Sequence, residues 1–125
     1  MKKVLLALVI LISLSLLGCS QNKSTNLTCD YTKVEVYYYY SPYCPHCEKV
    51  SPYVDELKER YKDVKFYYCN ISDRNISIVC YKYAYYVMGT PTVVVHADNV
   101  TLSLVGERDV LGLEKVIKSI ACCEK

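Results

Sequence analysis

The sequence predicts one α/β domain, in which a central mixed sheet is flanked by helices and the elements follow the order βαβαββα. Apolar runs of strand length alternate along the chain with segments whose apolar residues recur at helical spacing. The chain has 125 residues, 52% of them apolar, which is enough for one hydrophobic core. It also has eight cysteines, so thiol chemistry, disulfides or a metal must enter any account of it.

The first half of the predicted domain is a strand, a helix and a second strand. Residues 34–40 are almost all Val and Tyr, which is typical of a buried strand, and a Ser-Pro pair ends the run. Residues 44–61 place apolar side chains at helical spacing opposite charged ones, and Pro52 is expected to kink this helix. Residues 64–69 are the second strand.

The second half is a helix, a hairpin and a last helix. Helical spacing runs from residue 75 to residue 87, and an apolar strand follows at 92–96. Residues 100–104 alternate apolar and polar, as a hairpin partner with one face in water does, and Asp109 is a good N-cap for the last helix. Because strands joined through a helix usually run parallel, we expect only the hairpin to be antiparallel.

The N-terminus predicts export. Two lysines precede an apolar stretch at residues 4–17, which is too short to span a bilayer comfortably and is typical of a secretory signal. The stretch ends in Leu-Leu-Gly-Cys, which resembles the lipobox of prokaryotic lipoproteins. That resemblance implies cleavage before Cys19 and lipidation of its sulfur. The alternative is an ordinary signal, or an uncleaved anchor, next to an incidental cysteine.

This interpretation divides the chain into a signal peptide at 1–18, a lipidated cysteine with a polar tether at 19–29, and a folded domain at 30–125. The protein is then extracytoplasmic and anchored to the outer face of the cell membrane by its lipid. Glycosylation sequons support export independently, although composition bias could also produce them. The sequons begin at Asn26, Asn70, Asn75 and Asn99.

Charge excludes one class of partner. Apart from the two N-terminal lysines, 13 basic residues balance 13 acidic ones, and the lysines are interleaved with acids. A nucleic-acid-binding protein needs a basic stripe or patch, and the sequence has none. We therefore expect no nucleic-acid partner.

The chemistry is concentrated in Cys44-Pro45-His46-Cys47, directly after the first strand and at the start of the first helix. A helix N-terminus stabilises a thiolate on Cys44, and His46 adds a positive charge or an N–H donor beside that sulfur. Cys47, one turn along, can close a disulfide on a mixed disulfide held by Cys44. Cys44 is therefore the predicted nucleophile and Cys47 the resolving cysteine. The chain has no second CxxC to complete a zinc site, and we expect no metal and no cofactor.

Residues 34–121 resemble a short member of the thioredoxin superfamily. The matching residues are the CPHC motif, Pro52 eight positions after its first cysteine, Met-Gly-Thr-Pro-Thr at 88–92, and Gly106 after the last strand. The resemblance implies a thioredoxin-like fold in which Pro91 is cis and faces the dithiol, while the backbone of Thr90 binds an extended substrate peptide. The family commonly has a buried acid six positions before the first cysteine, where this sequence has Tyr38.

The Pro-His pair inside the motif resembles the active site of the periplasmic dithiol oxidase DsbA. This resemblance favours a thiol-disulfide oxidoreductase that works as an oxidase or isomerase rather than as a reductase. Its implied partners are cysteine-containing extracytoplasmic proteins, together with a membrane enzyme or another thioredoxin-like protein that restores its working state. The alternative is a noncatalytic thioredoxin-like module that binds a partner or handles a metal, with structural cysteines.

Several residues outside the motif keep two interpretations. Tyr43 next to the nucleophile either belongs to an apolar docking surface or simply packs, whereas the tyrosines at 37–40 are expected in the core. His96 is expected to be solvated or satisfied within the fold. The remaining cysteines could form bridges, one from Cys29 to the Cys122-Cys123 pair and one from Cys69 to Cys80, with one tail cysteine left over. A thiol relay through Cys69 is the less favoured alternative.

Overall fold

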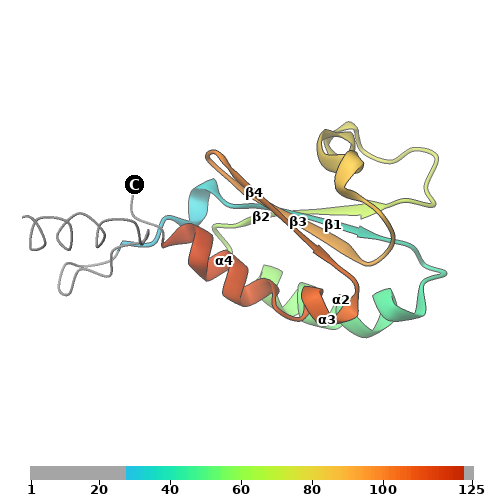
Figure 1. Ribbon diagram of the computed structural model, residues 1–125, viewed down its shortest axis with the longest axis horizontal. Helices are drawn as coiled ribbons and strands as arrows, with labels where there is room; N and C mark the ends of the chain where they lie inside the picture. The colour runs from blue at the N-terminus through green and yellow to red at the C-terminus, as the bar shows by residue number, and fades with distance from the viewer. Residues whose placement is uncertain (1–27, 123–125) are drawn as a thin grey trace, which may run out of the picture.

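The structure is a computed structural model that describes residues 28–122 (Figure 1). It is a four-stranded mixed sheet with helices on both faces, as the sequence predicts. In chain order the elements are η1 (Tyr31–Lys33), β1 (Glu35–Tyr40), α2 (Pro45–Arg60), β2 (Lys65–Asn70), η2 (Ile78–Tyr86), β3 (Thr92–Ala97), β4 (Val100–Val105), α3 (Glu107–Val110) and α4 (Leu113–Ala121). Figure 1 shows α2, α3 and α4 against one face of the sheet and η2 against the other.

The strands lie in the order β2-β1-β3-β4. β1 and β2 are parallel, as expected for strands joined through a helix, and β3 and β4 form the expected antiparallel hairpin. The expectation that only this hairpin is antiparallel is wrong, because β3 also runs antiparallel to β1, with Tyr39 opposite Thr92. The connection through η2 does not carry the chain back to the end of the sheet at which β1 and β2 begin. β3 therefore starts at the end where β2 stops, and it runs in the opposite direction.

The η2 segment explains that reversal. The sequence predicts a helix at 75–87, but the structure has a shorter 3-10 helix, with non-helical dihedral angles at Tyr83. A disulfide from Cys80 to Cys69 holds η2 against the end of β2, and the Tyr39 hydroxyl donates to the Cys80 carbonyl at 2.6 Å. These two contacts tie Cys80 to the sheet, where the segment forms a 3-10 helix in place of the regular helix expected.

Helix α2 forms where expected and buries one face. Cys44 is its N-cap, Pro45 occupies the first turn, where a missing N–H costs nothing, and Pro52 lies inside the helix. Val50, Val54 and Leu57 are fully buried and pack under the sheet. Contacts with the core therefore hold α2 in place along its length, and they also set the position of its first turn.

The C-terminal part differs from its prediction. Two helices replace the expected one: Asp109 lies inside α3, and Gly112 is the N-cap of α4. The Gly112 N–H donates to the backbone carbonyl of Asp109, which ends the first helix before the second begins. β4 is an edge strand, and Leu102 is exposed although it lies on the same face as Leu104, which packs against the core.

The core has two layers, one on each face of the sheet. The larger layer lies between the sheet and helices α2 and α4, and the smaller one lies under η2. Tyr37, Tyr38 and Tyr39 are each 1% exposed, which confirms their prediction as core residues. His96 is satisfied, as expected, because its Nδ1 lies 2.8 Å from the Thr101 hydroxyl.

In the described part of the chain, two disulfides outside the CPHC motif close the fold, and both agree with the pairings suggested by the sequence. One joins Cys29 to Cys122, 93 positions apart, and the other joins Cys69 to Cys80. Cys69 is fully buried and bonded, so the thiol relay through it is wrong for this state. Cys19, Asn26 and Cys123 lie outside the described residues. Within residues 28–122, no helix is long and apolar enough to cross a bilayer.

Candidate active site

The CPHC motif lies where β1 gives way to α2, and Cys44 and Cys47 form a disulfide across the first helical turn. Their Cα atoms are 5.2 Å apart. The two cysteines differ in access, since Cys44 is partly exposed while Cys47 is 2% exposed. An incoming thiolate can therefore reach only the Cys44 sulfur.

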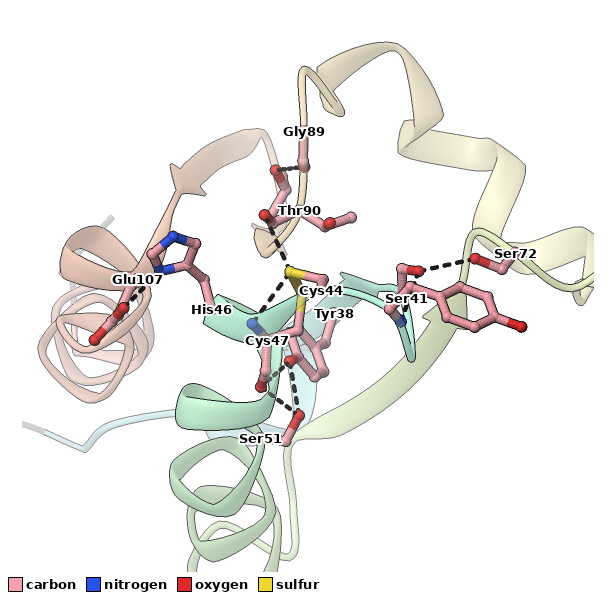
Figure 2. The surroundings of a disulfide bond; sticks show 12 residues. Tyr38, Ser41, Cys44, His46, Cys47, Ser51, Ser72, Gly89, Thr90 and Glu107 are labelled. Atoms are coloured by element: carbon pink, nitrogen blue, oxygen red, sulfur yellow. Dashed lines mark hydrogen bonds and ion pairs between the residues drawn. A yellow bond between two sulfur atoms is a disulfide. The ribbon is translucent and has the colours of Figure 1, made fainter.

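The backbone around Cys44 is arranged to support negative charge on its sulfur. The Cys47 N–H is shared between the Cys44 carbonyl at 3.1 Å and Cys44 Sγ at 3.2 Å, so one N–H donor of the first helical turn points at the sulfur (Figure 2). The dipole of the 16-residue helix α2 adds partial positive charge at the same end. Both effects favour thiolate over thiol once the disulfide is reduced.

A cis peptide bond faces the dithiol. The Thr90–Pro91 bond is cis, which confirms the expectation drawn from the family resemblance. The Thr90 carbonyl oxygen lies 3.4 Å from Cys44 Sγ, and Figure 2 shows it aimed at the sulfur. Pro91 is buried, and its own carbonyl accepts the Gly106 N–H at 2.8 Å, which ties this loop to the end of β4. The site is thus assembled from three separate segments.

His46 points to a residue that the sequence did not single out. Its Nδ1 lies 2.8 Å from Glu107 Oε2, and Lys49 Nζ lies 3.5 Å from the same oxygen. The hydrogen bond with His46, and then the charge of Lys49, lower the pKa of Glu107. Glu107 directly follows Gly106, which matched the family motif, but no spacing in the sequence relates it to residue 46.

Tyr38 lies behind the motif, at the position where the family commonly has a buried acid. Its hydroxyl lies 2.9 Å from the Ser51 hydroxyl and donates to the Cys47 carbonyl at 3.3 Å. Burial raises the pKa of Tyr38, so its phenol stays neutral at physiological pH. The pair supports the backbone of the resolving cysteine, and sequence spacing did not identify Ser51 as its partner.

The surface around the dithiol carries exposed apolar side chains beside charged ones. Tyr43 is 86% exposed, so the packing interpretation is wrong for it, and Met88, two residues before Thr90, is equally exposed. A groove runs along the cis-proline loop beside the dithiol. It is lined by His46, Thr90, Pro91, Gly106, Glu107, Arg108 and Leu111.

The fold and the dithiol together define a redox protein of the thioredoxin fold. The family profile described as Thioredoxin matches residues 21–119, so the chain belongs to the thioredoxin family. No curated protein matches the chain in sequence.

Solved thioredoxins share this fold. A mutant thioredoxin from Halobacterium salinarum is 27% identical, with a TM-score of 0.57, and the match covers 71% of this chain and 75% of that one. Thioredoxin O2 from Arabidopsis thaliana, in the oxidized state, is 25% identical with a TM-score of 0.58, over 75% of this chain and 80% of that one. Mitochondrial thioredoxin 3 from Saccharomyces cerevisiae is 24% identical with a TM-score of 0.56, over 74% and 82%, which supports the fold alone.

Proposed function

We propose that this protein is an extracytoplasmic thiol-disulfide oxidoreductase, tethered to the membrane, that works as an oxidase or isomerase. The observation that supports it best is the placement of Cys44 Sγ. This sulfur is partly exposed at a helix N-terminus, accepts the Cys47 N–H, and lies 3.4 Å from the Thr90 carbonyl oxygen. The helix N-terminus and the Cys47 N–H stabilise Cys44 as a leaving thiolate, which makes the disulfide a strong oxidant, whereas the Thr90 carbonyl marks where a substrate backbone lies.

The proposed oxidative cycle has two exchange steps. A substrate thiolate attacks Cys44 Sγ, the Cys44–Cys47 bond breaks, and Cys47 leaves with the electron pair and takes up a proton. A second thiolate of the substrate then attacks the substrate sulfur that is bonded to Cys44. The substrate disulfide forms, and Cys44 leaves as a thiolate. The substrate loses two electrons and two protons overall, and the dithiol gains two electrons. A membrane enzyme or another thioredoxin-like protein reoxidises it.

Substrate peptides would bind along the cis-proline loop. Thr90 offers its backbone, Pro91 shapes the loop, and Tyr43 gives an apolar contact beside the sulfur. Pro45 fixes the first turn of α2, and His46 adds charge near Cys44. The substrates in this proposal are unfolded or flexible proteins with cysteine thiols, because pairing with the backbone of the cis-proline loop needs an extended segment.

The structural disulfides support an oxidising compartment. The Cys29–Cys122 and Cys69–Cys80 bridges are separate from the motif, and structural disulfides persist outside the cytoplasm. The position of Cys29 also suits a tether. Cys29 is bonded beside the end of α4, whereas Cys44 follows the far end of β1, about 20 Å away along a six-residue strand. In Figure 1 the described N-terminus and the start of α2 lie at opposite ends of the molecule, so a lipid on Cys19 would leave the dithiol facing away from the membrane.

The decisive measurement is the equilibrium of Cys44–Cys47 with glutathione redox buffers. We expect a reduction potential well above that of thioredoxin and toward about −120 mV. A value near about −270 mV would refute the oxidase direction. A Cys47→Ala variant should trap mixed disulfides with substrates through Cys44, and a Cys44→Ala/Cys47→Ala variant is the matched control. If Cys44 shows neither trapping nor preferential alkylation at mildly acidic pH, the noncatalytic module is the correct function.

Export is tested separately. Incorporation of labelled fatty acid should require Cys19, so a Cys19→Ser variant should lose both the label and membrane retention. Asn75 and Asn99 are exposed, so both should be modified in a host that glycosylates exported proteins. Asn70 is half-buried and its Oδ1 accepts the Ser72 N–H, so it is a poorer acceptor of a glycan. A glycosidase shift that disappears in Asn75→Gln/Asn99→Gln tests this, and an unmodified wild-type chain contradicts it.

A further inference from the structure

The contact between His46 and Glu107 joins two parts of the site that are distant in sequence. His46 lies in the first turn of α2, and Glu107 begins α3 after the last strand. Figure 2 shows the imidazole turned toward the Glu107 carboxylate, with its Nδ1 at 2.8 Å. Among the hydrogen bonds of the described residues, none joins His46 to either sulfur. In the disulfide form, the charge partner of His46 is therefore Glu107.

The position of Glu107 is fixed by backbone rather than by its own side chain. Gly106 has φ 86° and ψ 166°, a conformation almost restricted to glycine, and its N–H donates to the Pro91 carbonyl at 2.8 Å. The cis-proline loop, Gly106 and Glu107 thus form one rigid edge of the groove. This edge presents a carboxylate to His46 across from the dithiol.

Reduction of the disulfide changes the charges around His46. The disulfide is neutral, whereas the dithiol form has a thiolate on Cys44, two residues before His46. A positively charged imidazole would then be shared between two anions, the thiolate two residues earlier in the chain and the Glu107 carboxylate that it contacts. The other charged groups near His46 are Lys49, which also contacts Glu107, Arg108 in the same groove, and Glu48 in the helix. His46 lowers the pKa of Glu107, so the carboxylate keeps its charge in mildly acidic solution.

We propose that Glu107 is a positioning residue that holds His46 in the disulfide form and competes with the Cys44 thiolate for it in the dithiol form. The inference rests on the proposed function and specifies how its redox equilibrium is set. Because Glu107 interacts best with His46 when no thiolate is present, it stabilises the disulfide relative to the dithiol. Glu107 therefore makes the protein a weaker oxidant than its Cys-Pro-His-Cys motif alone would.

A Glu107→Gln variant tests this in glutathione buffers at about pH 5.5, about one unit below the reference pKa of a model imidazole. We expect the exchange equilibrium to move about twofold to fivefold toward the dithiol form, the size typical of an exposed ion pair. That change equals a rise in potential of roughly 10 to 20 mV. The ultraviolet titration of the Cys44 thiolate should also move to lower pH. An unchanged equilibrium overturns the inference.

Two further variants distinguish competition for His46 from a general charge effect. In a His46→Ala background, Glu107→Gln should change the equilibrium much less, because the group that both anions share is gone. Glu48→Gln removes an equal charge from the first turn of α2, but residues two apart on a helix do not face each other. Its effect should be the same with and without His46. If Glu107→Gln retains its full effect without His46, the inference is refuted.

This result is separable from the function itself. A wild-type protein whose dithiol does not exchange with glutathione contradicts the proposed function, whatever Glu107 does. Normal exchange with equal constants for wild type and Glu107→Gln contradicts only the role of Glu107.

Discussion

The Cys29–Cys122 disulfide offers the sharpest test of how this small domain is stabilised. We consider a Cys29→Ala/Cys122→Ala variant in a Cys123→Ala background, so that no neighbouring thiol can replace the bridge. The Asp30 N–H still donates to the Ala121 carbonyl at 2.9 Å, so the two ends stay in contact in the folded state. The change therefore acts mainly on the unfolded chain, which loses its longest closed loop.

The magnitude follows from the length of that loop. With a sequence separation of 93, the chain-entropy model gives about 4.7 kcal/mol of stabilisation. The same relation gives about 3 kcal/mol for Cys69–Cys80, with a separation of 11. A domain of this size is stable by about 5 to 15 kcal/mol, so loss of the long bridge removes from about a third to nearly all of that stability.

The assay is denaturant unfolding followed by circular dichroism, without reductant and with the Cys44–Cys47 pair oxidised. We expect the free energy of unfolding to fall by about 4 to 5 kcal/mol, and the denaturant slope to rise because the unfolded chain is less compact. The Cys123→Ala single variant is the reference. A loss below about 1 kcal/mol would refute the loop-closure reasoning, because it would mean that the bridge does not restrict the unfolded chain.

Three further predictions concern the site and its surroundings. Gly106→Ala forces a side chain into a backbone conformation that favours glycine, and it should lower the free energy of unfolding by about 1 to 3 kcal/mol. The cost is backbone strain and not a clash, because no atom lies within 4 Å of the added Cβ. An unchanged free energy of unfolding in denaturant contradicts the strain. Hydrogen bonds from Lys118, Tyr61 and Arg60 lower the pKa of Glu114 to about 2. Glu114 therefore contributes stability that is fully present above pH 4.5 and is lost as the pH falls through about 2. The stability difference between wild type and Glu114→Gln should therefore shrink in that window, and a difference independent of pH contradicts the assignment. Tyr43→Ser should slow exchange with cysteine-containing peptides. Exchange with glutathione and thermal stability should stay within error, because the side chain is 86% exposed. Equal losses with peptides and with glutathione argue against a docking role.

Much of the fold could be predicted because local patterns agree with it. All four strands begin within one residue of their predicted positions, since short runs rich in Val and Tyr, or an alternation of apolar and polar residues, favour a strand when turn residues bound them. The direction of β3 relative to β1 was missed. It depends on whether the segment before β3 crosses the sheet, and the Cys69–Cys80 bridge and the Tyr39 hydroxyl, both nonlocal, decide that it does not.

The candidate site divides in the same way. The dithiol and the cis-proline loop could be identified because each is a short motif whose residues lie together in the sequence. Glu107 and Ser51 could not, because an isolated acid or serine on a surface has no distinguishing pattern. Their roles come from distances of 2.8 Å to His46 and 2.9 Å to Tyr38, across 61 and 13 positions of the chain.

The sequence by itself determined the chemistry of this protein, because a cysteine pair at a strand-to-helix junction obtains its reactivity from the first turn of the helix, a local structure. The tertiary structure alone decided what surrounds that pair. It placed the Thr90 carbonyl at the Cys44 sulfur, exposed Tyr43, and brought Glu107 to His46. These placements depend on the order of strands in the sheet and on the packing of the core beneath α2, which bring together groups that no local pattern relates.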